Sequence, residues 1–185
     1  MAYEETGASL SMTKSAVLKT TATDNGLLEK IHEGAYTFGY TKLVPASGDA
    51  GVEFGSGAWY DASEKNNTVY AVKPSGAGAV PVLAGVFVRQ PYIAAGFPAR
   101  PDRIEPHNKG LICYEGKVKY KTGLAADGTT VQTFADVQAG YGAYISDTTG
   151  KVHFAASDPD SGYTKFGKII RMNPDDSSFT VKVSF

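Results

Sequence analysis

Glycine and proline interrupt this chain so often that few long helices or strands can run through it. The 185 residues include 21 glycines and 9 prolines. Both residue types favour turns, because glycine tolerates positive φ and proline fixes φ near −65°. The runs between them are rich in β-branched and aromatic side chains, which are typical of strands. We therefore expect a mainly β protein with at most one or two short helices.

The last third of the sequence has the clearest strand pattern. Short apolar runs predict strands at residues 111–114, 116–121, 142–145, 152–154, 166–172 and 179–185. Turn-forming pairs separate these runs at Glu115-Gly116, Asp127-Gly128, Thr149-Gly150, Asp158-Pro159 and Asn173-Pro174. Strict alternation in the last run predicts a strand with one face in water. The pattern predicts a small β-barrel or sandwich over residues 108–185.

Two further regions precede this domain. Residues 1–23 are rich in Ser, Thr and Ala and follow no clean hydrophobic period, so we expect an extended N-terminal arm. Residues 24–107 predict a β-rich region that contains one short helix and a proline-rich excursion. The prediction of this helix is based on a candidate N-cap at Asp24 or Asn25. It also rests on the spacing of Leu27, Leu28 and Ile31, which would share one helical face.

Strands are also predicted in the middle of the chain. One opens near Trp59 and Tyr60, and another is expected at residues 68–72. The run 80–88 predicts a strongly buried strand, because its four valines share one parity: Val80, Val82, Val86 and Val88. Pro81 keeps the start of that strand near an edge or a bend.

The proline-rich excursion is a candidate contact segment. Four prolines fall between residues 91 and 106, so this stretch must run as an extended surface loop. It carries Tyr92, Phe97, Arg100 and Arg103, and tyrosine and arginine dominate the energetics of many protein interfaces. The same side chains could instead fasten the loop to its own domain, and the sequence leaves both interpretations open.

Bulk properties argue against several classes of partner. The formal charge of −1 provides no whole-chain field to attract nucleic acid or an anionic membrane, and no apolar run approaches 18 residues. The first 20 residues lack the basic start and apolar run of a signal peptide. Because Cys113 is the single cysteine, no internal disulfide is possible, and we expect assembly in the cytoplasm.

Motif matches to known chemistry fail at essential positions. Residues 162–168 have the spacing of a phosphate-binding loop, but Ile169 stands where a serine or threonine should bind magnesium. His32 and Glu33 begin like a zinc protease helix, yet Tyr36 occupies the position of the second histidine. We therefore interpret the first motif as strand sequence and expect no zinc site at the second.

The remaining reactive side chains form no recognisable set. The three histidines and Cys113 are far apart in the sequence, and none of them forms a pair at metal-ligand spacing. A cysteine between Ile112 and Tyr114 is more often a small core residue than a nucleophile. The later aspartates lie where tight turns require them, at Asp147, Asp158, Asp160, Asp175 and Asp176. No cofactor, metal or catalytic residue is predicted, and we expect a protein that is not an enzyme.

The C-terminal strand pattern resembles that of the cement or decoration proteins of tailed-bacteriophage capsids. The resemblance extends over residues 108–185 and, more loosely, over the proline-rich segment. The stretches that carry it are residues 110–120 with Gly116-Lys117-Val118, 137–145, 147–152, 166–170, the Asn173-Pro174 turn and 179–183.

This resemblance implies a virion structural protein that binds the outer surface of an assembled capsid and bridges neighbouring capsomers. Its expected partners are the major capsid protein and, as a homotrimer, itself. The protein would be located on the capsid exterior after assembly in the host cytoplasm. We place contacts on the arm and on the proline-rich segment, at Tyr3, Leu10, Met12, Tyr92, Phe97, Arg100 and Arg103.

Two alternatives stay open at this stage. A glycan-binding β module of a phage fibre or cell surface would use Trp59, Tyr60 and Tyr141 as stacking faces. A hydrolase on the same scaffold would need two carboxylates about 5 to 9.5 Å apart, a distance that a sequence cannot reveal.

Overall fold

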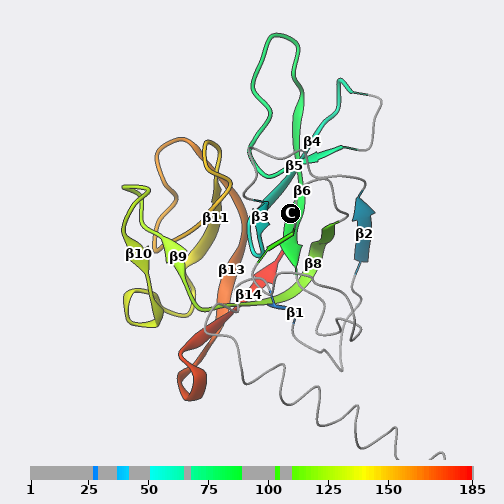
Figure 1. Cartoon of the computed structure of the whole chain (residues 1–185). Helices are drawn as coiled ribbons and strands as arrows, with labels where there is room; N and C mark the ends of the chain where they lie inside the picture. Colours follow the sequence, from blue (N-terminus) through cyan, green and yellow to red (C-terminus); the bar gives the residue numbers. More distant parts are fainter. Residues whose placement is uncertain are drawn as a thin grey trace, which may run out of the picture.

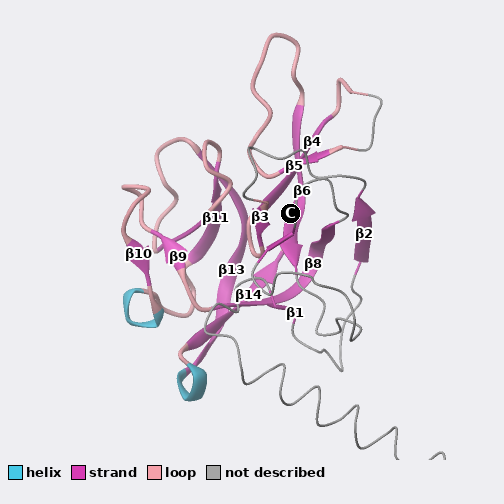
Figure 2. Cartoon of the chain, viewed as in Figure 1, coloured by secondary structure: helices cyan, strands magenta, loops and turns pink. Residues whose placement is uncertain are grey.

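Strands dominate the part of the chain that the computed structural model describes, residues 27–28, 37–41, 51–64, 68–88, 103–104 and 110–184. The mainly β fold class is therefore confirmed (Figure 2). The strands are β1 (Leu27–Leu28), β2 (Thr37–Thr41), β3 (Val52–Glu53), β4 (Gly57–Asp61), β5 (Val69–Tyr70), β6 (Pro81–Val88), β7 (Arg103–Ile104), β8 (Gly110–Tyr120), β9 (Gly123–Leu124), β10 (Val131–Gln132), β11 (Gly142–Ser146), β12 (Val152–Ala155), β13 (Tyr163–Asn173) and β14 (Ser178–Val183). Two 3₁₀ turns occur in these ranges, η2 (Phe134–Asp136) and η3 (Pro174–Asp176). No helix among the described residues is long and apolar enough to cross a membrane.

Ten strands form one antiparallel sheet that curls on itself (Figure 1). The strand order is β12-β11-β13-β14-β8-β6-β4-β5, and β1 and β2 pair with β8 beside this path. Strands from before and after residue 108 thus share one sheet. The division into regions 1–23, 24–107 and 108–185 stays a prediction.

The strand order has β12 and β11 at one end and β4 and β5 at the other, and these two ends meet. We call this contact, between the β11–β12 turn and β4–β5, the seam. The backbone N–H of Gly57 donates a hydrogen bond to the carbonyl oxygen of Gly150 over 2.8 Å. Gly150 has a φ of +70°, and a Cβ placed on it would lie 1.9 Å from the carbonyl oxygen of Ala71. Because that gap admits no side chain, glycine is required for this close approach.

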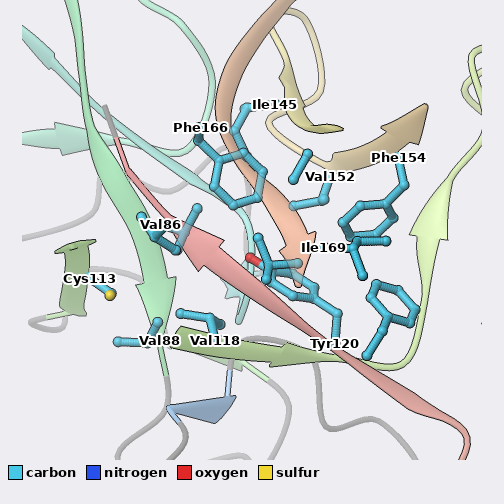
Figure 3. Close-up of a cluster of buried hydrophobic side chains, with 14 of the residues drawn as sticks. Val86, Val88, Cys113, Val118, Tyr120, Ile145, Val152, Phe154, Phe166 and Ile169 are labelled. Carbon is cyan, nitrogen blue, oxygen red and sulfur yellow. The ribbon is translucent and has the colours of Figure 1, made fainter. Parts of the chain in front are cut away.

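The main core lies inside the curl (Figure 3). Tyr120 is fully buried, and its hydroxyl donates a hydrogen bond to the carbonyl oxygen of Gly55 over 3.0 Å. The ring of Phe154 meets that of Tyr120 edge-on at 5.6 Å, and the ring of Phe179 stacks on it at 6.4 Å. Aromatic pairs in these geometries add to the free energy of burial. Other core residues come from most of the long strands: Trp59, Val86, Cys113, Val118, Ile145, Phe166, Ile169 and Val181.

A smaller core lies on the opposite face of β4, β6 and β8. Successive residues of these strands alternate between the two cores, as Val86 in the main core and Phe87 in the smaller one illustrate. The pair β3–β7 contributes Val52 and Ile104 to the smaller core. These strands are therefore covered on both faces where the two cores overlap.

The β9–β10 hairpin protects the outer edge of β12. The side-chain amide of Gln132 donates to the carbonyl oxygen of Phe154 over 2.8 Å, and the N–H of Phe154 donates back to the Gln132 side-chain oxygen over 2.9 Å. A ring nitrogen of His153 lies 2.8 Å from the carbonyl oxygen of Leu124. The Gln132 side chain thus takes the place of a neighbouring strand along this edge.

The helix predicted near residues 24–31 is wrong at Leu27 and Leu28. These two residues form β1 and pair with Lys119 and Val118 of β8. Leucine has a high helix propensity, but pairing with β8 outweighs that weak local preference. The rest of the predicted helix and the arm, residues 1–23, lie outside the described residues.

The turn predicted at Glu115-Gly116 is also wrong, because β8 runs without a break across these residues. Gly116 has a φ of +147°, which bends the strand at this point. β8 pairs with β2 and β6 before the bend and with β14 from Gly116 onward. The glycine therefore marks a change of partner within one continuous strand, whereas the other four predicted turns do separate strands.

β6 is the strand predicted from its valines, but only its second half is buried. Val86 and Val88 are buried in the main core, whereas Val80, just before the strand, and Val82 are 53% and 47% exposed. The pairing with β4 shifts by one residue beside Gly85, as in a β-bulge. The extra residue reverses the alternation, so the four valines do not share a face.

The alternation in β14 is confirmed on its apolar side, which points into the main core. The polar side of this strand is exposed only at Lys182, because Ser178 and Thr180 are buried. The side-chain amide of Asn173 donates to both hydroxyls, over 3.2 and 3.3 Å. The predicted wet face is therefore wrong at Thr180, whereas Lys182 and Ser184, just beyond the strand, are exposed as predicted.

Replacing Gly150 with alanine should lower the free energy of unfolding more than replacing Gly128 does. Both residues have φ near +70°, so each alanine costs about 1–2 kcal/mol for its backbone conformation. Only the methyl group at position 150 would also collide with Ala71, since nothing lies within 4 Å of it at position 128. Urea denaturation of Gly150→Ala and Gly128→Ala measures the difference, and equal losses would contradict the role of the seam.

Candidate interaction surface

The connection between β5 and β6, residues 71–80, projects from the body of the barrel. Figure 1 shows this β5–β6 loop as the tall green loop above both strands. A Cβ placed on Gly76 or Gly78 would meet no atom within 4 Å. The tip of the loop therefore stands clear of the rest of the described chain and is accessible to a partner.

One base of the loop is fixed beside the seam. The Lys73 ammonium pairs with the Asp147 carboxylate of the β11–β12 turn at 2.7 Å, and it also lies 5.3 Å from the ring centroid of Trp59. The two charged side chains are 34% and 20% exposed, so solvent limits the ion pair to about 1 kcal/mol or less. Its effect is mainly geometric, because it joins the loop to the opposite end of the sheet.

The other base is held by Asp61 at the end of β4. Its side chain accepts hydrogen bonds from the N–H of Val80 over 3.0 Å and from the N–H and hydroxyl of Ser63 over 2.9 and 2.6 Å. The Ser63 hydroxyl, followed by the Val80 and Ser63 amides, lowers the pKa of this carboxyl below its usual value. A carboxylate, rather than a carboxylic acid, therefore fixes the start of β6.

Val80 and Val82 form an exposed apolar pair beside this base, here called the valine patch. Val82 lies opposite Tyr60, whose ring packs against the smaller core, so the patch continues that core into solvent. Five large apolar side chains are strongly exposed among the described residues, and Val72, Val80 and Val82 are three of them. Apolar groups gathered on a projecting element are typical of a contact surface.

Most of the predicted contact residues cannot be placed. Tyr3, Leu10, Met12, Tyr92, Phe97 and Arg100 lie outside the described residues. Arg103 belongs to β7, where it is half-buried and lies opposite Glu53 in the strand pairing with β3. The valine spacing indicated a buried strand, so the sequence reasoning missed the valine patch as a contact surface. The proline between the two valines was the available signal of a strand that begins outside the core.

The aromatic residues proposed for glycan stacking do not form one platform. Trp59 is 2% exposed and belongs to the main core. Tyr60 packs against the smaller core on the opposite face of β4, and burial raises the pKa of its hydroxyl. Tyr141 is half-buried against the main core. Since stacking requires exposed ring faces that share one surface, this arrangement does not support glycan binding through these three residues.

A polar cluster beside β11 and β13 has the residue types of an acid–base site, but the pKa values of its charged groups do not suit proton transfer. The Tyr144 hydroxyl donates to Asp158 over 2.5 Å, and the Lys165 ammonium lies 2.9 Å from the same carboxylate. Hydrogen bonding to Tyr144 and Lys165 lowers the pKa of Asp158, and Asp158 in turn raises the pKa of Lys165. Both groups are thereby held in their charged forms, whereas a general acid or base works near its own pKa.

The remaining reactive groups and hollows among the described residues also do not form a catalytic or ligand site. Burial raises the pKa of the Cys113 thiol to about 12, which suits the predicted core residue rather than a nucleophile. No group of three potential metal ligands occurs in the described ranges. A hollow of about 180 Å³ between β3 and the β9–β10 hairpin is smaller than the roughly 300–1,000 Å³ of typical ligand sites.

The base of the β5–β6 loop should respond to acid. Because the folded pKa of Asp61 is lowered, its contribution is present above the unfolded pKa and is lost as the pH falls through the folded value. The amide resonance of Val80 should titrate with a midpoint below about 3.9, the usual aspartate value. NMR titration measures this midpoint, and Asp61→Asn should abolish the transition. A Val80 midpoint at or above the usual value would contradict the assignment.

Comparison with known proteins places the fold. No family model and no curated protein matches the chain. Among solved structures it is similar to a chain of "The capsid of Myoviridae Phage XM1", with a TM-score of 0.52 and 12% sequence identity. The alignment covers 89% of this chain and 93% of that chain. At this identity the likeness is one of fold, and the chain accordingly has a phage capsid-related fold.

Proposed function

We propose that this chain is a virion structural protein that binds the outer surface of an assembled phage capsid and bridges neighbouring capsomers. Its partner is the major capsid protein, and it acts as a homotrimer on the exterior of a particle that assembles in the host cytoplasm. The observation that carries the proposal is the fold shared with a chain of a phage capsid structure over nearly the whole length of both chains. The role involves no catalysis.

The architecture supports a protein that grips a large surface. The seam joins both ends of the main sheet, so contacts at one end of the barrel are held rigidly relative to the other. A preorganised element loses less conformational entropy when it binds than a flexible one. The β5–β6 loop, fixed at both bases, presents the valine patch in this way.

Binding of this kind would stabilise the capsid by mass action. A ligand that binds only the assembled lattice lowers the free energy of that state relative to its dissociated subunits. A trimer that contacts several capsomers gains further, because the second and third contacts form at high effective concentration. In the proposal, the contacts at Tyr3, Leu10 and Met12 would order the arm on the shell, and the proline-rich segment would add more.

The direct test uses capsids of the encoding virus that were assembled without this protein. The purified chain should co-sediment with them at a fixed ratio, and cryo-electron microscopy should locate it on the outer surface between capsomers. Light scattering of the free protein should give the mass of a trimer. Failure to co-sediment, or density located only inside the shell, would overturn the proposal.

The valine patch should contribute to capsid binding. In Val80→Ser/Val82→Ser, two half-exposed valines lose their methyl groups, which should weaken capsid binding about tenfold or more. Val131→Ser is the control, because Val131 is 52% exposed on a different hairpin. Co-sedimentation titrations compare the three proteins, and circular dichroism confirms that each is folded. Equal binding by the double variant and the wild type would exclude the patch from the interface.

A further inference from the structure

Three lysines stand side by side across three neighbouring strands. In the register of the main sheet, Lys117 of β8 is directly opposite Lys182 of β14, and Lys182 is directly opposite Lys168 of β13. Figure 1 shows these strands as consecutive members of the sheet. Their neighbours Val118, Val181 and Ile169 are buried in the main core. Because side chains alternate, the three lysines project from the outer face, and we call them the lysine row.

The lysine row lacks compensating acids within the described chain. Lys168 and Lys182 are exposed and Lys117 is half-buried, and none of the three forms an ion pair with any residue that the structure describes. The same face carries Lys119 and Arg171, which both lie opposite Thr180. The Asp176 carboxylate pairs with Lys119, and the charge of Lys121 also lowers the pKa of this carboxyl.

This arrangement works against the stability of the isolated protein. Opposite residues on adjacent antiparallel strands have Cβ atoms about 4.5–5.5 Å apart, and like charges at that separation repel. The strand register places five cations on this face, although the whole chain has a charge of −1. The paired segments 116–120, 167–173 and 178–183 contain no aspartate or glutamate, so their outer face is positively charged. A partner that brings negative charge would relieve the repulsion.

We propose that the outer face of β13, β14 and β8 is a docking surface for a carboxylate-rich protein surface, which on the proposed function belongs to the capsid shell. The inference rests on that function only for the identity of the partner. The lysine row supplies the electrostatic complementarity, and the valine patch on β6 supplies a separate apolar contact. Complementary charge of this kind raises the rate of association and selects the orientation of docking.

The composition of this face favours an acidic protein over single-stranded nucleic acid. Proteins that bind single strands need exposed aromatic rings on which bases stack. The aromatic residues of the paired segments 116–120, 167–173 and 178–183 are Tyr120 and Phe179, and both are fully buried in the main core. Ile170 is 37% exposed between Lys168 and Arg171, next to the point where the β13–β14 register shifts. An apolar residue among cations suits a protein interface.

The test removes charge from the lysine row and compares the effect with removal of a charge outside β13, β14 and β8. Lys168→Gln/Lys182→Gln should weaken binding to capsids about tenfold and reduce the dependence of affinity on NaCl concentration, and Lys182→Gln alone should do so in part. Lys151→Gln, which removes one exposed lysine from the β11–β12 connection, should retain the affinity and the salt dependence of the wild type. The first variant should also melt at the same temperature as the wild type or higher, since it relieves repulsion.

A second probe separates this inference from the capsid role. A poly-glutamate peptide titrated into the wild type should shift NMR resonances of Lys117, Lys168 and Lys182, and a duplex DNA probe should bind more weakly than the peptide. If capsids do not bind but the peptide maps to the row, the proposed function fails and the acidic docking surface stands. Unchanged capsid affinity in Lys168→Gln/Lys182→Gln, absence of peptide shifts at the row, or tighter binding of the DNA would overturn the inference.

Discussion

The fold depends on one close backbone contact, at the seam between the β11–β12 turn and the β4–β5 end. There the backbone N–H of Gly57 and the carbonyl oxygen of Gly150 join the two ends of the curled half-barrel. Gly150 makes the approach possible, because the carbonyl oxygen of Ala71 occupies the space of a side chain. The same contact places the β11–β12 turn where Asp147 can pair with Lys73. A single glycine thus links closure of the barrel to the position of the projecting loop.

Local pattern was enough to predict the strands but not their partners. Alternation and turn residues located β11 to β14 to within three residues at each end, because those signals lie within a few positions of each strand. The errors at Leu27, Glu115 and Val80 share another origin. Each depends on pairing with a strand far away in the sequence. At Leu27 the pairing with β8 overrides helix propensity, and near Glu115 the strand exchanges partners at Gly116. At Val80 a bulge in the pairing with β4 reverses the alternation.

The candidate surfaces also depend on strand pairing that local sequence patterns do not reveal. Val80 and Val82 were predicted, but as core, since the bulge beside Gly85 leaves no mark in the hydrophobic pattern. The lysine row left no signal in the sequence, because its members are 14 and 51 positions apart and meet only through the register of three strands. A net charge near zero also conceals a face of one sign. The predicted contacts on the arm and the proline-rich segment stay predictions.

The Gln132 side chain has a consequence for a protein that would work in many copies. An unpaired strand edge can template another chain, and crowding on a lattice raises the chance of such encounters. By satisfying both backbone groups of Phe154, Gln132 removes a foothold for that pairing. Side-by-side polymerisation into fibres is thereby discouraged at the β12 end, where a neighbouring chain would have to displace the Gln132 side chain before it could pair.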